Sequence, residues 1–337
     1  MPDPSKSARD HGAVLIGVLA VLACAAGLAS ISFGSAHIPI AHVVGGFFGL
    51  ADPVTNAIIG DIRLPRALLG LLVGGILGMS GAALQGYLRN PLAEPSTLGL
   101  SNSAALGAAI ALYFGFAADY EWSLPLFAIV GTLIAMFVLI ALSRVAEGAL
   151  ALILGGIAVG TLAGAAISLA LNLSTNPFAA MELTFWLLGS VEDRSMQHVL
   201  LVLPFAALSV ALLMWDRKAL DALTLGEEAA QSLGFDLRFV QLRLMVAIAL
   251  GVGAAVAVCG SIAFVGLVVP HAMRTWTGSQ PSKLLLPSAL AGAILLTAAD
   301  ILVRLIPTTN ELKLGVVTAF LGAPFFLHLL FKARRTW

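Results

Sequence analysis

Charged residues are scarce in this sequence. Only 11% of the 337 residues are Asp, Glu, Lys or Arg, whereas 59% are hydrophobic and the mean hydropathy is +0.99. A soluble globular domain carries about 25% charged residues, so this chain lacks the polar surface that water requires. The formal net charge is zero and aromatic residues make up 7%, which excludes the basic, aromatic surface typical of nucleic-acid binding. We therefore expect the lipid bilayer to be its main solvent.

Cysteine and histidine are also sparse. Cys24 and Cys259 are the only two cysteines, and each lies inside an apolar run. Two such residues predict neither a disulfide framework nor a thiolate metal site, so we interpret them as small buried hydrophobes. His271 has no second His or Cys at ligand spacing, and no phosphate-binding Gly-x-x-x-x-Gly-Lys loop, nucleophile–base pair or paired carboxylates are present. We predict no catalytic residue, no metal site and no cofactor bound by this chain.

Long apolar runs dominate the sequence instead. A membrane-spanning helix needs about 20 mainly apolar residues, and most of ten apolar segments approach that length. The segments are Ala13–Phe33, Ala67–Tyr87, Thr97–Phe116, Leu124–Leu142, Ala149–Leu171, Val199–Trp215, Leu244–Cys259, Phe264–Trp276, Leu286–Ile306 and Leu314–Phe331. The segment with Pro270 is too short to span the bilayer comfortably alone, so we expect it to pack inside the protein. The sequence predicts an all-α polytopic membrane protein with about ten spans.

Basic residues are distributed unequally between the two sides of these spans. Thirteen of the 18 Lys and Arg residues fall on the side of the termini. The other five are Arg63, Arg66, Arg194, Arg304 and Lys313. The positive-inside rule therefore predicts that both termini are cytoplasmic. Lys6 and Arg9 before an apolar run also resemble a signal peptide, but its cleavage would remove the first span and spoil this asymmetry.

The longest predicted cytoplasmic loop, at about residues 216–243, contains the signal of a short helix. Thr224 followed by Glu227 fits a capping box, with Thr224 as the N-cap. The expected helix ends at Gly234, because glycine is favoured just after a helix. With Ala229 and Ala230 on one side, such a helix suits docking into a groove of another protein. Its spacing alone is equally consistent with a surface helix that lies on the membrane.

Short segments in a specific order distinguish this chain from other apolar sequences. They are Arg63–Arg66, Asn90–Pro95, Leu98–Gly99, Glu228–Gly234, Gly260–His271, Ala298–Asp300 and Gly315–Pro324. Glu228–Gly234 resembles the Glu-Ala-Ala-x-x-x-Gly loop by which bacterial ABC importer permeases contact their ATPases. Together the segments resemble the FecCD-type permease family, which serves importers of iron siderophores, haem and cobalamin. The similarity covers nearly the whole chain, with one small departure at Ala263, where the family usually has Gly.

This resemblance implies a type II ABC importer permease that forms one domain over residues 1–337. It implies a homodimer or a close heterodimer of such subunits in the bacterial inner membrane, and a homodimer is the first expectation. Two cytosolic ATPases, which use ATP and Mg, would bind below the permease, and a periplasmic substrate-binding protein would dock above it. The implied ATPase-coupling residues are Thr224, Gly226, Glu227, Glu228, Ala229, Ala230, Leu233 and Gly234.

Three of the outward basic residues, Arg63, Arg66 and Arg304, lie at span ends. Arg63 and Arg66 are three residues apart and are expected to share one helix face. In the family, matching arginines receive carboxylates from the binding protein, and such charge-assisted pairs suit Arg better than Lys. The alternative is that these arginines extend to lipid headgroups. Asp300, four residues before Arg304, is expected to pair with it.

The resemblance also implies which residues form the gate and the pathway. Two prolines and an Asn-Pro turn signal in Asn90–Pro95 predict a broken hairpin between the second and third spans. The resemblance implies that Asn90, Pro91 and Leu92 belong to an inner gate, with a plain tight turn as the alternative. The fifth span, the segment after it and the tenth span would line the pathway. The first two of these contribute Asn172, Ser174, Thr175, Asn176, Met181, Glu182 and Trp186. This lining is polar and mostly uncharged, which suits a permease that must release an intact metal chelate.

We therefore expect a permease subunit rather than an enzyme, with ATP hydrolysed by a separate partner. Ferric siderophore is the first expected cargo, because of how often the family carries it, and cobalamin and haem are the alternatives. A secondary transporter or channel would be expected to show several buried ionisable residues or a half-to-half repeat, and neither is clear in the sequence. A membrane enzyme would need a catalytic set at membrane depth.

Overall fold

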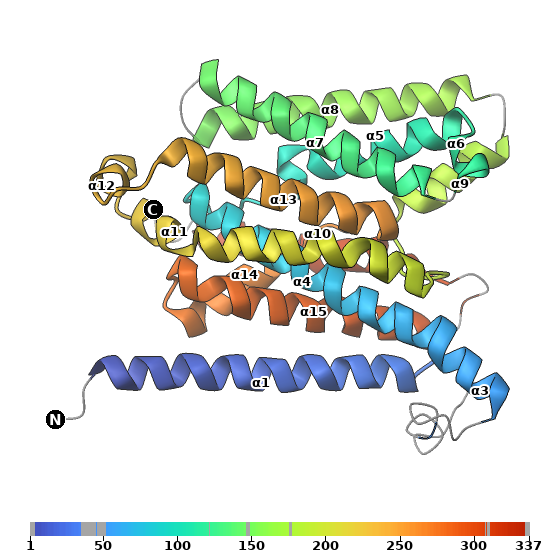
Figure 1. The fold of residues 1–337 in the computed structure, drawn as a ribbon, viewed down its shortest axis with the longest axis horizontal. Helices are drawn as coiled ribbons and strands as arrows, with labels where there is room; N and C mark the ends of the chain where they lie inside the picture. Colours follow the sequence, from blue (N-terminus) through green and yellow to red (C-terminus); the bar gives the residue numbers. More distant parts are fainter. Residues whose placement is uncertain are drawn as a thin grey trace.

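The structure is a computed structural model in which helices run side by side between two ends (Figure 1). It describes residues 4–34, 45, 52–120, 122–145, 149–174, 177–306, 308 and 311–333. The long helices are α1 (Pro4–Ser32), α4 (Leu64–Tyr87), α5 (Leu100–Tyr113), α7 (Ser123–Val145), α8 (Ala149–Leu173), α10 (Met196–Trp215), α13 (Leu237–Cys259), α14 (Val265–Thr277), α15 (Pro281–Leu305) and α16 (Leu314–Ala333). The short ones are α3 (Pro53–Ala57), η1 (Ile58–Arg63), η2 (Pro95–Leu98), α6 (Phe116–Asp119), α9 (Pro177–Leu187), α11 (Arg217–Leu223) and α12 (Glu227–Ser232).

Each of the ten long helices overlaps one of the ten apolar segments of the sequence, which confirms the all-α prediction. Within the described residues, seven helical spans are long and apolar enough to cross a bilayer, and α5 and α16 are shorter apolar helices. The remaining helix, α14, has 13 residues and buries Val265, Gly266, Leu267, Val269 and Pro270. The first half of this helix therefore packs inside the protein as predicted, whereas Ala272, Thr275 and Trp276 in its second half are exposed.

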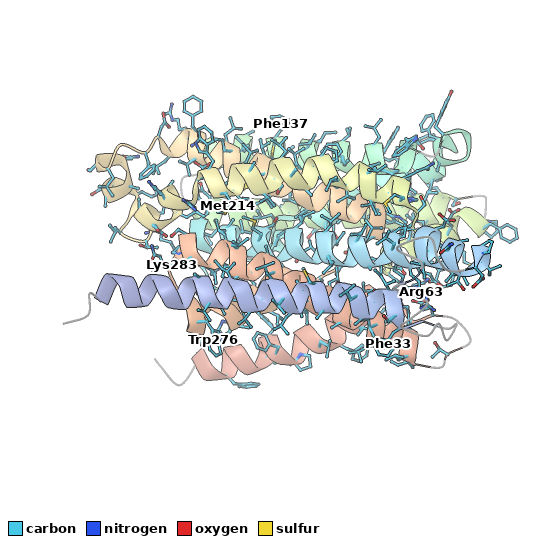
Figure 2. The ribbon with its side chains drawn as sticks, turned by 60° about the horizontal axis from the view of Figure 1, so that its bottom comes forward. Phe33, Arg63, Phe137, Met214, Trp276 and Lys283 are labelled. Atoms are coloured by element: carbon cyan, nitrogen blue, oxygen red, sulfur yellow. The ribbon has the colours of Figure 1, made fainter. Side chains whose placement is uncertain are left out.

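The two ends of the bundle carry different elements. α11 and α12 lie at one end, where α1 begins and α16 ends, and we call it the α12 end (Figure 1). α3 lies at the opposite end, the α3 end. Trp276 and Lys283 lie at the α12 end, whereas Phe33 and Arg63 lie at the α3 end (Figure 2). The first and last described helices thus meet the same end, as an even number of crossings requires.

The second span begins earlier than the apolar pattern predicts. Instead of starting at Ala67, the helix runs from Pro53 through η1 to Tyr87, over 35 residues. Hydropathy falls at Arg63 and Arg66, but both residues are buried, so their charge does not mark the end of the helix. The turn η1 is π-helical, a rare geometry that is frequent at functional sites.

Close contact between α4 and α15 depends on glycine. A Cβ atom at Gly74 would lie 2.3 Å from the carbonyl oxygen of Gly292, and one at Gly78 would lie 2.2 Å from that of Ser288. Helices in membranes gain stability from such close packing of backbones, because lipid supplies little hydrophobic driving force between them. The two helices therefore form the tightly packed centre on which the neighbouring helices are placed.

Gly78→Ala should destabilise the protein, because the added methyl group meets backbone that cannot rotate away. We expect a loss of about 1–3 kcal/mol, in the range of overpacked cores. The free energy of unfolding in detergent micelles measures it. Gly17→Ala in α1 is the matched control, since no atom lies within 4 Å of a Cβ added there. Equal stability of the two variants would contradict the packing role of Gly78.

Candidate functional site

The helix α12 stands at the end of the bundle opposite the arginines. It begins at Glu227 after Gly226, which acts as N-cap with φ of 109°. The prediction that Thr224 is the N-cap was wrong. Thr224 instead ends α11, and its hydroxyl donates to the carbonyl oxygen of Asp221 at 2.7 Å. The chain bends at Gly226 between the two helices, so the side chain of Thr224 does not serve the first turn of α12.

The C-terminal end of α12 agrees with the sequence pattern. Gly234 has φ of 89°, and its N–H donates to the carbonyl of Gln231 at 2.9 Å. The N–H of Phe235 donates to the carbonyl of Ala230 at 3.2 Å. These two bonds form a Schellman motif, which accounts for the glycine. The predicted end of the helix at Gly234 is confirmed.

The two faces of α12 differ in what they contact. Ala230 is fully buried, in a cluster with Ala222 and Leu223 against which Tyr87 and Phe235 pack. The alanine side thus packs on its own chain, contrary to the interpretation of the alanines as a docking face. The surface that remains open combines carboxylates with large apolar side chains: Leu225, Glu227, Glu228, Gln231 and Leu233. A partner protein would meet these side chains.

The predicted gate residues form a turn directly after α4. The side-chain oxygen of Asn90 accepts a hydrogen bond from the N–H of Leu92 at 2.9 Å, and Pro91 is exposed. Arg89, just before this turn, has φ of 50°. Its guanidinium lies 3.7 Å from the carboxylate of Glu227. The structure therefore places the gate turn beside the first turn of α12, and the role of a gate stays a prediction.

The three arginines meet at the α3 end around a cavity of about 380 Å³. Arg66 donates to both oxygens of Asp300, with Nη2 at 2.8 Å from Oδ1, and it also pairs with Glu311. Arg304 pairs with Asp300 at 2.9 Å, which confirms the predicted pair. Asp300 is only 2% exposed, so both cations neutralise a buried carboxylate.

The same arginines fix the end of α1. The Nη1 of Arg63 donates to the carbonyl oxygens of Ile31 and Ser32, each at 2.9 Å. The Nη1 of Arg304 donates to the carbonyls of Ser30 and Phe33, each at 2.9 Å. These carbonyls belong to the last turn of α1 and the residue after it, where they lack partners within the helix. The cluster thus has a structural role, and its role in docking stays a prediction.

The predicted pathway residues lie on α8, α9 and the connection between these helices. Asn172 is exposed and donates to the carbonyl of Ser168 at 3.3 Å, and Met181 is 53% exposed. Ser174 and Trp186 are partly buried. Thr175 and Asn176 lie outside the described residues. The predicted residues on α8 and α9 are thus accessible to different degrees, and none is tied into a catalytic arrangement.

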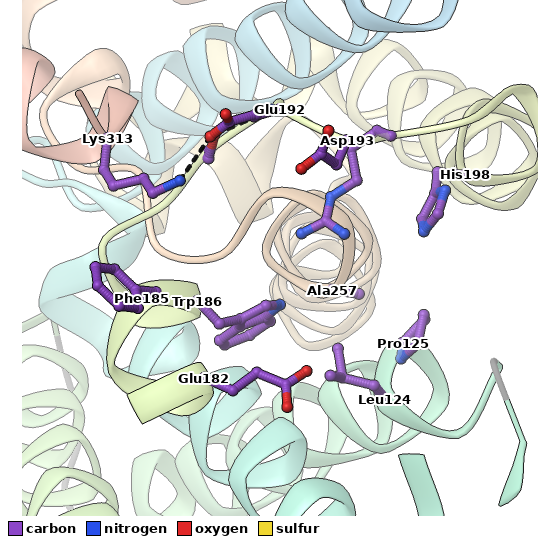
Figure 3. A pocket seen from close by; sticks show the side chains of 12 residues that line it. Leu124, Pro125, Glu182, Phe185, Trp186, Glu192, Asp193, His198, Ala257 and Lys313 are labelled. Atoms are coloured by element: carbon purple, nitrogen blue, oxygen red, sulfur yellow. Dashed lines mark hydrogen bonds and ion pairs between the residues drawn. The ribbon is translucent and has the colours of Figure 1, made fainter. Parts of the chain in front are cut away.

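A polar cavity of about 370 Å³ opens beside α9 (Figure 3). Glu182 and Trp186 line one side of it, and Glu192 pairs with Lys313 at 2.6 Å on the other. Arg194 also lines the cavity. Sequence reasoning included Glu182 and Trp186 in the pathway but missed the Glu192–Lys313 pair, because 121 residues separate its members. Within the described part of the chain, no three His, Cys, Asp or Glu side chains gather as a metal site.

Comparison with known proteins agrees with this arrangement. The model of the FecCD transport family matches residues 21–332. The uncharacterized ABC transporter permease protein YvrB of Bacillus subtilis (strain 168) is 39% identical over 318 residues, 90% of each chain. The vitamin B12 import system permease protein BtuC of Citrobacter koseri is 40% identical over 275 residues, 82% of this chain and 83% of that one.

A solved structure supports the same assignment. It is an ABC transporter assigned to the metal-chelate type, in an inward-facing conformation. Its chain is 30% identical to this one and superposes with a TM-score of 0.84, over 95% of this chain and 99% of that one. The chain therefore belongs to the FecCD transport family and is a multi-pass membrane permease subunit of an ABC importer.

Proposed function

We propose that the chain works as a homodimer in the bacterial inner membrane, with both termini in the cytoplasm. Two cytosolic ATPases, which bind ATP and Mg, dock on α12, and a periplasmic binding protein docks at the α3 end. The observation that carries this proposal is the open face of α12, where Leu225 and Leu233 are 71% and 62% exposed. Exposed leucines beside acidic residues, at the end where α1 begins and α16 ends, suit a protein partner.

The cargo that we propose is an intact metal chelate. The family resemblance makes ferric siderophore the first expectation, with cobalamin and haem as alternatives. Cobalamin becomes the first candidate because BtuC relatives that are 40% identical bear the name of a vitamin B12 import system. The exposed side chains of Asn172 and Met181 offer no set of ligands that would hold a bare metal ion.

Uptake of radiolabelled chelates tests the cargo. A strain that lacks its own permeases receives this chain with its ATPase and binding protein, and is offered cobalamin, ferric siderophore and haem in turn. We expect ATP-dependent uptake of the intact chelate, with cobalamin first. The control strain carries an ATPase that cannot hydrolyse ATP. A tight, stoichiometric iron site in the isolated permease would contradict the passage of an intact chelate.

Leu233→Asp should weaken binding of the ATPase about tenfold, because a charge replaces an apolar side chain at the proposed contact. Affinity of the purified permease for the ATPase measures the effect. Ser279→Asp is the matched control, since it adds the same charge at an exposed position of the α12 end but outside α12. Equal affinity of both variants for the ATPase would remove α12 from the contact.

Ala230→Arg would also stop transport, but its cause would be ambiguous. Ala230 lies on the fully buried side of α12, so an arginine there cannot stay in place without opening the cluster. We expect this variant to unfold more readily than Leu233→Asp. Thermal unfolding of the two variants separates a lost contact with the ATPase from a lost fold.

Glu311→Gln should strengthen docking of the binding protein about two- to fivefold, the range of an exposed ion pair. Glu311 forms an ion pair with the guanidinium of Arg66. Neutralising Glu311 therefore leaves Arg66 more available to a carboxylate of the binding protein. The dissociation constant at low and high salt measures this. Glu192→Gln is the matched control at the same end, because Glu192 pairs with Lys313 instead. Weaker or unchanged docking of Glu311→Gln would contradict the assigned role of Arg66.

A further inference from the structure

Glu94 is a buried carboxylate in the loop that joins α4 to α5. Only 8% of the residue is exposed. Its side-chain oxygen accepts a hydrogen bond from the backbone N–H of Phe264, which lies 170 positions later in the sequence. Phe264 is the N-cap residue of α14 and makes no side-chain cap of its own. Glu94 therefore caps the start of α14 from a distant loop, because it binds a backbone N–H that has no partner within the helix.

The segment that Glu94 holds is in contact with the proposed pathway. Phe264 has φ of 70°. A Cβ atom added at Gly322 of α16 would lie 2.2 Å from the Cβ of Phe264. Just before Phe264, the carbonyl of Cys259 accepts a hydrogen bond from the N–H of Ser190, after α9, at 2.7 Å. A shift of Phe264 would therefore displace α16. The same linker also meets the segment after α9 without free space, since a Cβ atom at Gly189 would lie 2.4 Å from the carbonyl oxygen of Ser261.

The other end of the same loop is in contact with α12. Tyr87 packs against the cluster of Ala230, and Arg89 lies 3.7 Å from Glu227. Between Arg89 and Glu94 the chain makes the tight turn at Asn90. A continuous line of contacts thus runs from α12 through this turn and Glu94 to Phe264.

The loop also has a fixed support on its far side. After Glu94, the helix η2 and Gly99 pack against α8, where a Cβ at Gly99 would lie 2.5 Å from the backbone nitrogen of Gly160 and 2.7 Å from the carbonyl oxygen of Gly156. Because backbone meets backbone there, the loop cannot yield toward α8. Displacement of the first half of the loop, before Glu94, is therefore directed toward Phe264. The hydrogen bond from the N–H of Phe264 to Glu94 connects the two.

We propose that Glu94 is the positioning residue that transmits displacement of α12 to the linker 260–264 and so couples ATP hydrolysis to opening of the pathway. This inference rests on the proposed function, because it needs an ATPase bound at α12. Without the carboxylate of Glu94, the ATPase would still displace α12, but a smaller part of that displacement would reach the linker 260–264.

The test is the amount of cargo moved per ATP hydrolysed. Wild-type and variant permeases are placed in proteoliposomes with the ATPase and the binding protein. The probe is radiolabelled cobalamin, replaced by ferric siderophore or haem where the wild-type protein moves only that chelate. We expect Glu94→Ala to keep its ATP hydrolysis while the transport-to-hydrolysis ratio falls about fivefold, in the range measured for coupling residues. Glu94→Gln should lie between, since its amide oxygen can still accept the bond from Phe264.

Gln85→Ala is the matched control. Gln85 is 2% exposed, and its side chain donates to the carbonyl of Gly266 at 3.2 Å. It therefore also binds α14, but it belongs to α4 and not to the loop that carries Glu94. We expect Gln85→Ala to lower stability with an unchanged ratio. Where Glu94→Ala fails to fold, Glu94→Asp replaces it, because a carboxylate one methylene group shorter cannot reach Phe264 without a shift of the loop.

The outcomes separate the two levels of the proposal. A wild-type protein that moves no cargo with ATP would contradict the proposed function itself. A working wild-type protein with an unchanged ratio in Glu94→Ala, or in Glu94→Asp where that variant replaces it, would overturn the role of Glu94 alone. Equal falls of the ratio in the Glu94 and Gln85 variants would also overturn it, since the loss would then be a general effect of instability.

Discussion

Lipid offers no hydrogen bonds, so every polar group at membrane depth must find its partner inside the protein. In this chain the constraint is met by few charges that each serve several elements. Asp300 holds Arg66 of α4 and Arg304 of its own helix, and Arg304 in turn holds the carbonyls at the end of α1. Three helices are thereby fixed to one another at the α3 end by a single buried carboxylate.

A second buried carboxylate, that of Glu94, joins a loop to α14, and we connect it with the motion of that helix. Glu94 is one of the few ionisable groups that the described core encloses, and its partner is backbone at the start of the short helix α14. Such a helix has fewer internal bonds than a full span and depends on its neighbours for position. A carboxylate that caps it from another loop therefore gives that loop control over where the helix begins.

Local composition predicted the helices, and local geometry predicted one contact in the candidate site. Apolar runs of sufficient length need no long-range information, and Asp300 with Arg304 follows from the four-residue spacing of one helix face. Thr224 failed as a cap because the backbone bends at Gly226, and capping depends on where the backbone enters the helix. The pairing of Arg66 with Glu311, 245 positions apart, left no signal in a single sequence, because only the fold brings the two together.

The π-helical turn η1 lies between α3 and α4 and rotates these two parts of one long helix relative to each other about the helix axis. A turn of this kind contains an additional residue, and one residue corresponds to about 100° around a helix axis. The face that α3 presents is thereby set independently of the face on which Arg66 and the glycines of α4 lie. A family member that lost or gained a residue in η1 would turn α3 to present another face, while the packing of α4 with α15 stayed the same.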